Sequence, residues 1–149
     1  MSATSSELTP RDISQLEQTL VQLHHIFRRH RDHIKKKYQI SAVEMDIIQL
    51  IIQQGPCKMK HIADTFQLKL STLTSLVDKA ETQGILCRTS QPNDKRVVLL
   101  DVTAQGRSIY QDYSAYLTQI ARHIQHNFDE DTLQDFIRGV EVITRLTPG

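Results

Sequence analysis

Apolar residues recur every three or four positions between Ile13 and Ile34, and this spacing predicts a helix of about 25 residues. His30 falls on the same stripe, which repeats in the manner of a heptad pattern. A lone helix with such a stripe leaves apolar surface in water, so we expect a second helix to cover it. Residues 1–11 are rich in Ser and Thr, lack this spacing and are expected to be frayed.

A second helix is predicted to begin after Ser41. Ser41 followed three residues later by Glu44 is the pattern of a capping box. Residues 42–52 are apolar on most sides, which is typical of a helix buried at the centre of a small core. Gly55 and Pro56 are expected to end it.

Two shorter helices should follow, over residues 58–66 and 70–83, with a tight turn at 67–69 between them. Gly84 is expected to stop the second of these helices. Its apolar side chains have the spacing of a helix that buries one face, and they are Leu73, Leu76, Val77 and Ala80.

The periodicity then changes from that of a helix to that of strands. Residues 85–89 and 97–102 are strand-like runs, and the polar residues 90–95 between them have the composition of a turn. We therefore predict a β-hairpin. Two short helices joined by a tight turn and followed by a hairpin form a winged helix-turn-helix.

Two helices are predicted after the hairpin. Thr103 is expected to cap a long helix that reaches about Asn127. Asp129 or Asp131 is expected to start a last helix, whose apolar positions continue to Leu146. The predicted fold is therefore mainly α with a small β-hairpin.

The predicted helix at 70–83 suits the major groove of DNA, which is about 12 Å wide and admits one α-helix. Small hydroxyl side chains opposite its apolar stripe would let the backbone approach the bases. Ser and Thr are weak helix formers, so four of them among the first six residues is unusual for a purely structural helix. A plain solvated helix face is the alternative. The polar and flanking positions are Ser71, Thr72, Thr74, Ser75, Asp78, Lys79 and Thr82.

The hairpin loop adds a second candidate contact with DNA. Asp94 and Arg96 lie two residues apart, so the carboxylate is expected to hold the guanidinium in an extended rotamer. An oriented Arg at a wing tip fits the narrow minor groove, and Lys95 would then lie along the phosphates. The alternative is a surface ion pair of little energetic consequence.

Charge is distributed unevenly although the formal net charge is only +1. Residues 54–100 carry seven Lys or Arg against four Asp or Glu, whereas residues 101–149 carry four against seven. Such asymmetry fits one basic face and one acidic end. Residues 28–37 carry six basic groups against one Asp, and they would contact either the DNA backbone or only water.

Other sequence features narrow the class of protein. Cys57 and Cys87 are far apart and lack metal-like spacing, which favours a reducing compartment. We find neither a signal peptide nor an apolar run of the roughly 20 residues that span a bilayer, so a soluble, cytoplasmic protein is expected. The chain shows no Ser-His-Asp order, no Gly-rich phosphate loop and no paired acidic motif. We therefore expect that the protein is not an enzyme and needs no cofactor.

The chain resembles the MarR family of winged helix-turn-helix transcriptional regulators. The family's Asp-x-Arg wing pattern is present as Asp94-x-Arg96, and its helix start after the wing as Val102-Thr103-x-x-Gly106. The order and spacing match over about residues 40–106. Further matching residues are Ile62-Ala63, Leu73 to Val77, Gly84-Ile85, Arg88 and Leu100 to Gly106.

The resemblance implies a homodimer that binds a pseudo-palindromic operator in double-stranded DNA. It implies a repressor that leaves the DNA when a small ligand binds, or a repressor that is regulated by oxidation. The implied parts are a flexible N-terminus at 1–11, an N-terminal dimerisation helix at 12–39, a winged DNA-binding lobe at 40–102 and C-terminal dimerisation helices at 103–149. The apolar stripes of the first and last predicted helices agree with a dimer.

Three positions depart from the family's common pattern. Ser75 stands where a basic residue is frequent, Lys69 where a Ser or Thr cap is common, and Lys95 where the wing has a second basic residue. Base readout is therefore expected from Ser71, Thr72 and Ser75, with phosphate contacts from Lys69 and Lys79. The full set of expected DNA-binding residues is Lys60, Lys69, Ser71, Thr72, Thr74, Ser75, Lys79, Arg88, Asp94, Lys95 and Arg96.

The implied effector pocket lies between the dimerisation helices and the DNA-binding lobe. Its candidate polar groups are His30, Tyr38, Tyr110 and Tyr113. We expect no metal site, although His24, His25, His30, His33, His123 and His126 keep zinc sensing open. Oxidant sensing by Cys57 or Cys87 is a further alternative. The alternative from another functional class is a winged-helix module that binds other proteins instead of DNA.

Overall fold

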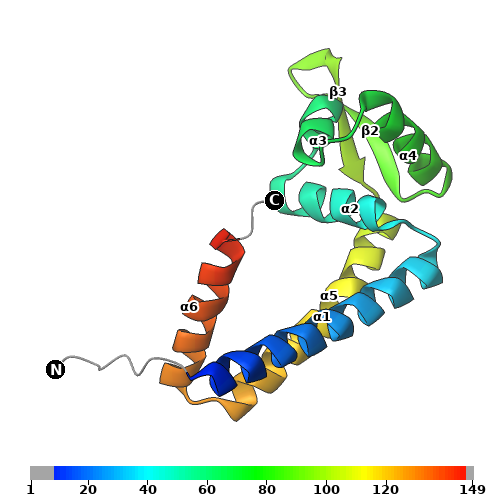
Figure 1. Cartoon of the computed structure of the whole chain (residues 1–149). Coiled ribbons are helices and arrows are strands. Elements are labelled where there is room, and N and C mark those ends of the chain that lie inside the picture. The colour runs from blue at the N-terminus through cyan, green and yellow to red at the C-terminus, as the bar shows by residue number, and fades with distance from the viewer. Residues whose placement is uncertain (1–8, 147–149) are drawn as a thin grey trace. The chain divides into compact units, whose positions relative to one another are not determined.

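The computed structural model describes residues 9–146, which Figure 1 traces from α1 to α6. This part of the chain forms two compact units whose boundary lies within one helix, between Tyr110 and Gln111. None of the helices within residues 9–146 has the length and apolar character needed to cross a lipid bilayer. The prediction of a frayed N-terminus falls largely outside the described residues.

Helix α1 spans Pro10–Tyr38, so it begins two residues before the predicted boundary at residue 12. Thr9 and Asp12 form a capping box, with Pro10 at the first helical position, where its missing N–H costs nothing. The sequence spacing correctly predicted one long helix here. Its N-terminal two thirds is exposed, and Ile34 near its end is buried.

Helix α2, Ala42–Gln54, forms the centre of the core, as predicted. The N–H of Ser41 donates to the Glu44 carboxylate at 2.5 Å, and the N–H of Glu44 donates to Ser41 Oγ at 3.1 Å. This confirms the capping box. The fully buried side chains of α2 include Met45, Ile47, Ile48 and Ile51.

Two helices follow, α3 at Met59–Thr65 and α4 at Leu70–Thr82. Gln67 in the turn between them takes a positive φ of 52°, which allows the chain to reverse sharply. Gly84 has a φ of 70° directly after α4, a conformation that L side chains rarely adopt. The predicted helix pair and its glycine stop are therefore confirmed.

The sheet has three antiparallel strands rather than the two predicted. Strand β1 is Cys57–Lys58, β2 is Leu86–Gln91 and β3 is Asp94–Val102, in the order β1-β3-β2. The hairpin strands run closer to the turn than expected, and their register shifts between Ser90 and Gln91. The β1 strand was missed because two residues are too short for a periodic pattern.

Helix α5 spans Ala104–Asn127, as predicted. Thr103 Oγ1 accepts a hydrogen bond from the N–H of Gly106 at 3.1 Å and donates to the Gly84 carbonyl at 2.6 Å. The predicted cap therefore also ties α5 to the turn after α4. Gly106 leaves no room for a side chain, since a Cβ would come within 2.6 Å of Val102 Cγ1.

Helix α6 spans Glu130–Leu146, and Asp129 caps it by accepting the N–H of Thr132 at 2.9 Å. Of the two predicted starts, Asp129 is correct. In the single chain α6 exposes a row of large apolar side chains, namely Phe136, Ile137, Val140, Val142 and Ile143. Helix α1 does the same with Ile13, Leu16, Leu20, Val21, Leu23 and Phe27.

Candidate nucleic-acid interface

Helix α4 has one apolar face in the core and one polar face in solvent. Leu73, Val77 and Ala80 are buried, with at most 1% of their surface exposed. Ser71 and Ser75 on the opposite face are exposed. Thr72 is also exposed, and Thr74 is half-buried. The hydroxyl-rich face is therefore accessible, and α4 could lie in a DNA groove with this face toward the bases.

Two hydroxyl groups of α4 that were expected at the DNA donate their protons back to the helix. Thr74 Oγ1 donates to the Leu70 carbonyl at 2.8 Å, and Ser75 Oγ donates to the Ser71 carbonyl at 3.2 Å. A hydroxyl carries one proton and two lone pairs. In this rotamer the two side chains can therefore accept hydrogen bonds from DNA but not donate them.

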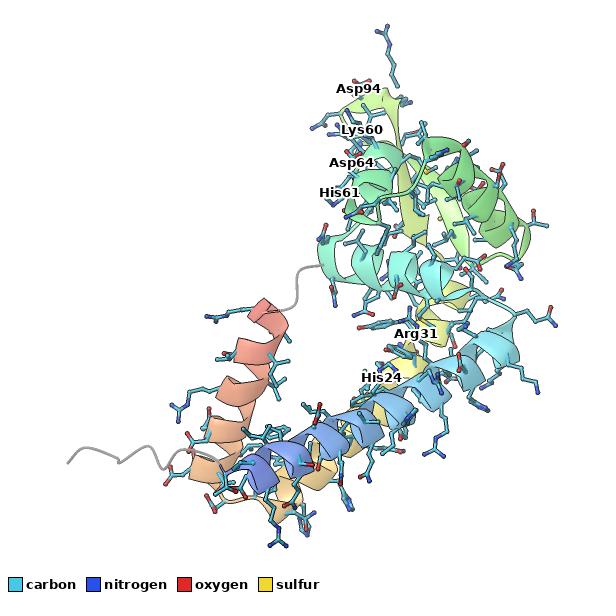
Figure 2. All side chains as sticks on the ribbon, in the orientation of Figure 1. His24, Arg31, Lys60, His61, Asp64 and Asp94 are labelled. Carbon is cyan, nitrogen blue, oxygen red and sulfur yellow. The ribbon has the colours of Figure 1, made fainter. Side chains whose placement is uncertain are left out.

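The tip of the β2–β3 hairpin carries exposed Asp94, Lys95 and Arg96. Figure 2 labels Asp94 at this tip and Lys60 on α3. Asp94 Oδ1 accepts the main-chain N–H of Arg96 at 3.0 Å. We expected the Asp94 carboxylate to hold the guanidinium, and the structure instead shows it bonded to the main chain. It stabilises the turn, and the Arg96 side chain extends from that fixed backbone.

Arg88 on β2 is engaged within the protein. Its guanidinium bonds Asp78 Oδ1 at 2.8 Å and also contacts the Glu81 carboxylate, and its N–H donates to Glu81 Oε1 at 3.0 Å. Asp78 and Glu81 belong to α4, so this cluster ties α4 to the wing. The expected contact of Arg88 with DNA stays a prediction, and it would have to compete with two carboxylates.

Lys79 on α4 is also paired internally. Its Nζ lies 3.2 Å from both carboxylate oxygens of Glu44, whose side chain is 1% exposed. Glu44 therefore caps α2 and at the same time holds α4. The sequence predicted Glu44 as a cap and Lys79 as a phosphate contact, but it offered no signal that these two residues, 35 positions apart, would pair.

Lys60 on α3 and Lys69 before α4 are exposed. Lys69 is the N-cap residue of α4, and its side chain makes no capping hydrogen bond. The first N–H groups of a helix without a side-chain cap need partners, and a DNA phosphate is a suitable one. Both lysines thus fit the expected phosphate contacts.

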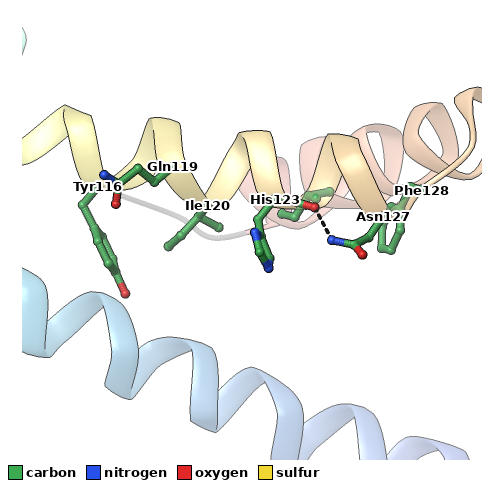
Figure 3. A pocket seen from close by; sticks show the side chains of 7 residues that line it. Tyr116, Gln119, Ile120, His123, Asn127 and Phe128 are labelled. Carbon is green, nitrogen blue, oxygen red and sulfur yellow. Dashed lines mark hydrogen bonds between the residues drawn. The ribbon is translucent and has the colours of Figure 1, made fainter.

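The four candidate effector residues, His30, Tyr38, Tyr110 and Tyr113, are all half-buried. They do not line the open groove on α5 that Figure 3 shows, which has a volume of about 420 Å³. That groove is lined by Tyr116, Gln119, Ile120, His123, Ile124, Asn127 and Phe128. None of these groove residues was among the predicted effector residues, because their spacing also fits simple helix packing.

In the part of the chain that the structure describes, the geometry shows neither a metal site nor a thiol activated for reaction. Within residues 9–146, no three His, Cys, Asp or Glu side chains gather closely enough to hold a metal ion. Burial and the nearby Asp101 carboxylate raise the pKa of the Cys57 thiol, which also donates to the Gly55 carbonyl. Burial, Asp101 and Glu81 raise the pKa of Cys87 as well. A raised pKa disfavours the thiolate, which is the form that reacts with oxidants.

Comparison with known proteins finds similarity to one family of regulators. The model of the MarR family matches residues 40–98, which cover the core helix α2, the pair α3 and α4, and most of the wing. The transcriptional regulator MhqR of Bacillus subtilis is 27% identical over 101 residues, or 63% of this chain and 70% of its own. The transcriptional repressor MdtR of the same organism is 25% identical over 66% of this chain and 64% of its own.

Solved structures share the fold over most of the chain. FabT of Streptococcus pneumoniae, solved in complex with DNA, has a TM-score of 0.71 and 19% identity, over 90% of this chain and 96% of its own. This likeness confirms a mainly helical winged helix-turn-helix fold with N- and C-terminal helices.

Proposed function

This chain belongs to the MarR family of DNA-binding transcriptional regulators, which are not enzymes, and on that premise we propose that it represses transcription as a homodimer. It binds a pseudo-palindromic operator, and a small ligand releases it. The relative MdtR is named a repressor, which supports this direction of regulation. The observation that carries the proposal is the exposed hydroxyl face of α4 in the same lobe as the basic hairpin tip.

The proposed DNA contacts follow from the exposed groups of this lobe. Helix α4 enters the major groove, where Ser71, Thr72 and Ser75 face base edges. Arg96 reaches the minor groove from the hairpin tip, and its turn is held by the Asp94 bond to the main chain. Phosphate contacts come from Lys60, Lys69 and Lys95, which are all exposed.

The apolar surfaces of α1 and α6 support a homodimer. Leu16 and Val21 of α1 are each 52% exposed in the single chain, and Val142 of α6 is 56% exposed. Rows of exposed apolar residues on two helices mark an interface, because isolated domains rarely leave such patches in water. The proposed dimerisation parts are residues 12–39 and 103–149, and the proposed effector residues are His30, Tyr38, Tyr110 and Tyr113.

A gel shift with the DNA upstream of the protein's own gene tests the proposal, followed by selection of bound sequences from a random pool. We expect a symmetric consensus with two half-sites about one helical turn apart and an affinity that falls steeply with salt. Selected pools that show no consensus, or no retarded band with either DNA, would overturn it. That result would favour a winged-helix module that binds proteins.

A further inference from the structure

An exposed apolar side chain lies at the start of α4, the helix proposed above to enter the major groove. Leu70, the first residue of α4, is 56% exposed, whereas Leu73 and Val77 further along the same helix are fully buried. Among the described residues of the winged lobe, Val98 on β3 is the other large apolar side chain that is exposed, at 48%. Packing within the lobe therefore does not account for the position of Leu70.

Two hydroxyl groups about one helical turn after Leu70 have limited chemistry. Thr74 Oγ1 donates its proton to the carbonyl of Leu70 itself, and Ser75 Oγ donates to that of Ser71. What remains on each is acceptor capacity. In the major groove, acceptors match the amino groups of adenine and cytosine, whereas guanine presents only the acceptors N7 and O6.

Helix α4 also lacks the usual means of reading guanine. The commonest specific contact with guanine is a bidentate bond from Arg or Lys. Lys79 is the one basic residue in α4, and both oxygens of the buried Glu44 hold its Nζ. The first turn of the helix, which contacts base edges in helix-turn-helix proteins, thus offers an apolar side chain and hydroxyls. The exposed cation directly before it, Lys69 at the N-cap, is assigned above to a phosphate.

We propose that Leu70 contacts the C5-methyl group of a thymine in the major groove and so fixes an A·T pair at one position of each half-site. The thymine methyl is the apolar group that distinguishes base pairs in this groove. Burying it against an exposed Leu removes apolar surface of both partners from water. This inference rests on the mode of DNA binding proposed above and names a determinant of its sequence preference.

Replacement of thymine by deoxyuridine tests the contact, because it removes the methyl group and leaves the hydrogen-bonding edges unchanged. A selected duplex is synthesised with each thymine replaced in turn, symmetrically in both half-sites, and affinity is measured by fluorescence anisotropy. With the natural protein, one position should weaken binding by about three- to fivefold per half-site, as expected for loss of one buried methyl group. The other positions should change it little.

The variant Leu70→Ala identifies the side chain responsible. It should bind the unmodified duplex about as weakly as the natural protein binds the responsive deoxyuridine duplex, and it should lose the response at that position. Val98→Ala, which also shortens an exposed apolar side chain of this lobe, should keep the full response. Leu70→Ala responding as the natural protein does would overturn the assignment.

The outcomes separate this inference from the proposed function. If the natural protein selects a consensus and no thymine position responds to deoxyuridine, the DNA-binding function stands and the role of Leu70 is wrong. If no DNA is selected at all, the proposed function fails first. The deoxyuridine series uses the unaltered chain, so a folding defect in a variant cannot hide either result.

Discussion

Individual basic residues of the winged lobe serve two different purposes. Lys79 and Arg88 pair with carboxylates of their own chain. Lys79 pairs with Glu44. Arg88 pairs with Asp78 and Glu81. Arg96 at the hairpin tip is exposed, and the structure pairs only its main-chain N–H with Asp94. The first two position α4, and Arg96 is available to DNA.

Arg96→Ala should lower operator affinity by about tenfold to a hundredfold, because an Arg in the minor groove interacts with focused negative potential. Fluorescence anisotropy with the selected duplex measures this loss, and size-exclusion chromatography should show an unchanged oligomer. Lys95→Ala is the matched control: its loss should be smaller and should reduce the slope of log affinity against log salt by about one. Full affinity of Arg96→Ala would discredit the wing assignment.

Lys79→Met should destabilise the fold by about 1–3 kcal/mol, because it leaves the buried Glu44 carboxylate without its cation. Urea unfolding measures this change. The salt slope of DNA binding should stay that of the natural protein, since both carboxylate oxygens of Glu44 hold the Lys79 ammonium group. A slope lower by about one would instead show a phosphate contact.

The same variant offers an internal check of the ion pair. Adding Glu44→Gln to Lys79→Met should recover much of the lost stability, because a Gln keeps the capping bond of α2 and carries no charge. If the double variant is no more stable than Lys79→Met, the loss comes from packing and not from the unpaired carboxylate.

At the scale of elements, the turn after α4 is fixed by contacts from the start of α5. Thr103 caps α5 and bonds the Gly84 carbonyl, and Gly106 allows the first turn of α5 to lie against Ile85 and Val102. The end of α4 and the start of the wing thus share one anchoring point. A substitution there should alter both elements together.

Gly106→Ala should destabilise the winged lobe by about 1–3 kcal/mol, even though Ala favours helices over Gly. The added Cβ would overlap the Ile85 carbonyl oxygen and approach Val102 Cγ1 at 2.6 Å. Thermal or urea unfolding measures the loss. Ser108→Ala, at an exposed position of the same helix, should change stability by about 0.5 kcal/mol or less. Equal stability of Gly106→Ala would contradict the close approach.

At the scale of the whole molecule, the single chain leaves much apolar surface uncovered. Exposed apolar rows occur on both α1 and α6, which lie at the two ends of the chain. The proposed pseudo-palindromic operator requires a two-fold symmetric protein, because each half-site would take one copy of α4. Dimerisation would therefore satisfy both the apolar surfaces and the geometry of the DNA.

Val140→Glu in α6 should convert the protein to a monomer or weaken the dimer strongly, since it places a charge where apolar surface is expected to be buried. Light scattering measures the mass, and operator affinity should fall with it. Glu141→Ala, at the neighbouring exposed position, should keep the dimer. A Val140→Glu variant that remains dimeric would remove α6 from the proposed interface.

The sequence by itself determined most of the elements and their order. Spacing, caps and turn residues act over a few positions, so the capping box at Ser41, the stop at Gly84 and the cap at Thr103 could be predicted from neighbouring residues alone. The hydroxyl face of α4 and the basic hairpin tip were visible for the same reason. The motifs of the wing also carry the resemblance to the MarR family.

Only the tertiary structure decided which of the basic groups are engaged within the protein and how the site is held. Glu44 forms an ion pair with Lys79, 35 positions later in the sequence. Arg88 of the wing forms ion pairs with two carboxylates of α4. Strand β1 exists because Cys57 pairs with Leu100 on β3. The exposure of Leu70 likewise depends on where the core ends. Local sequence patterns cannot predict these pairings and exposures, because the residues involved are brought together only by folding.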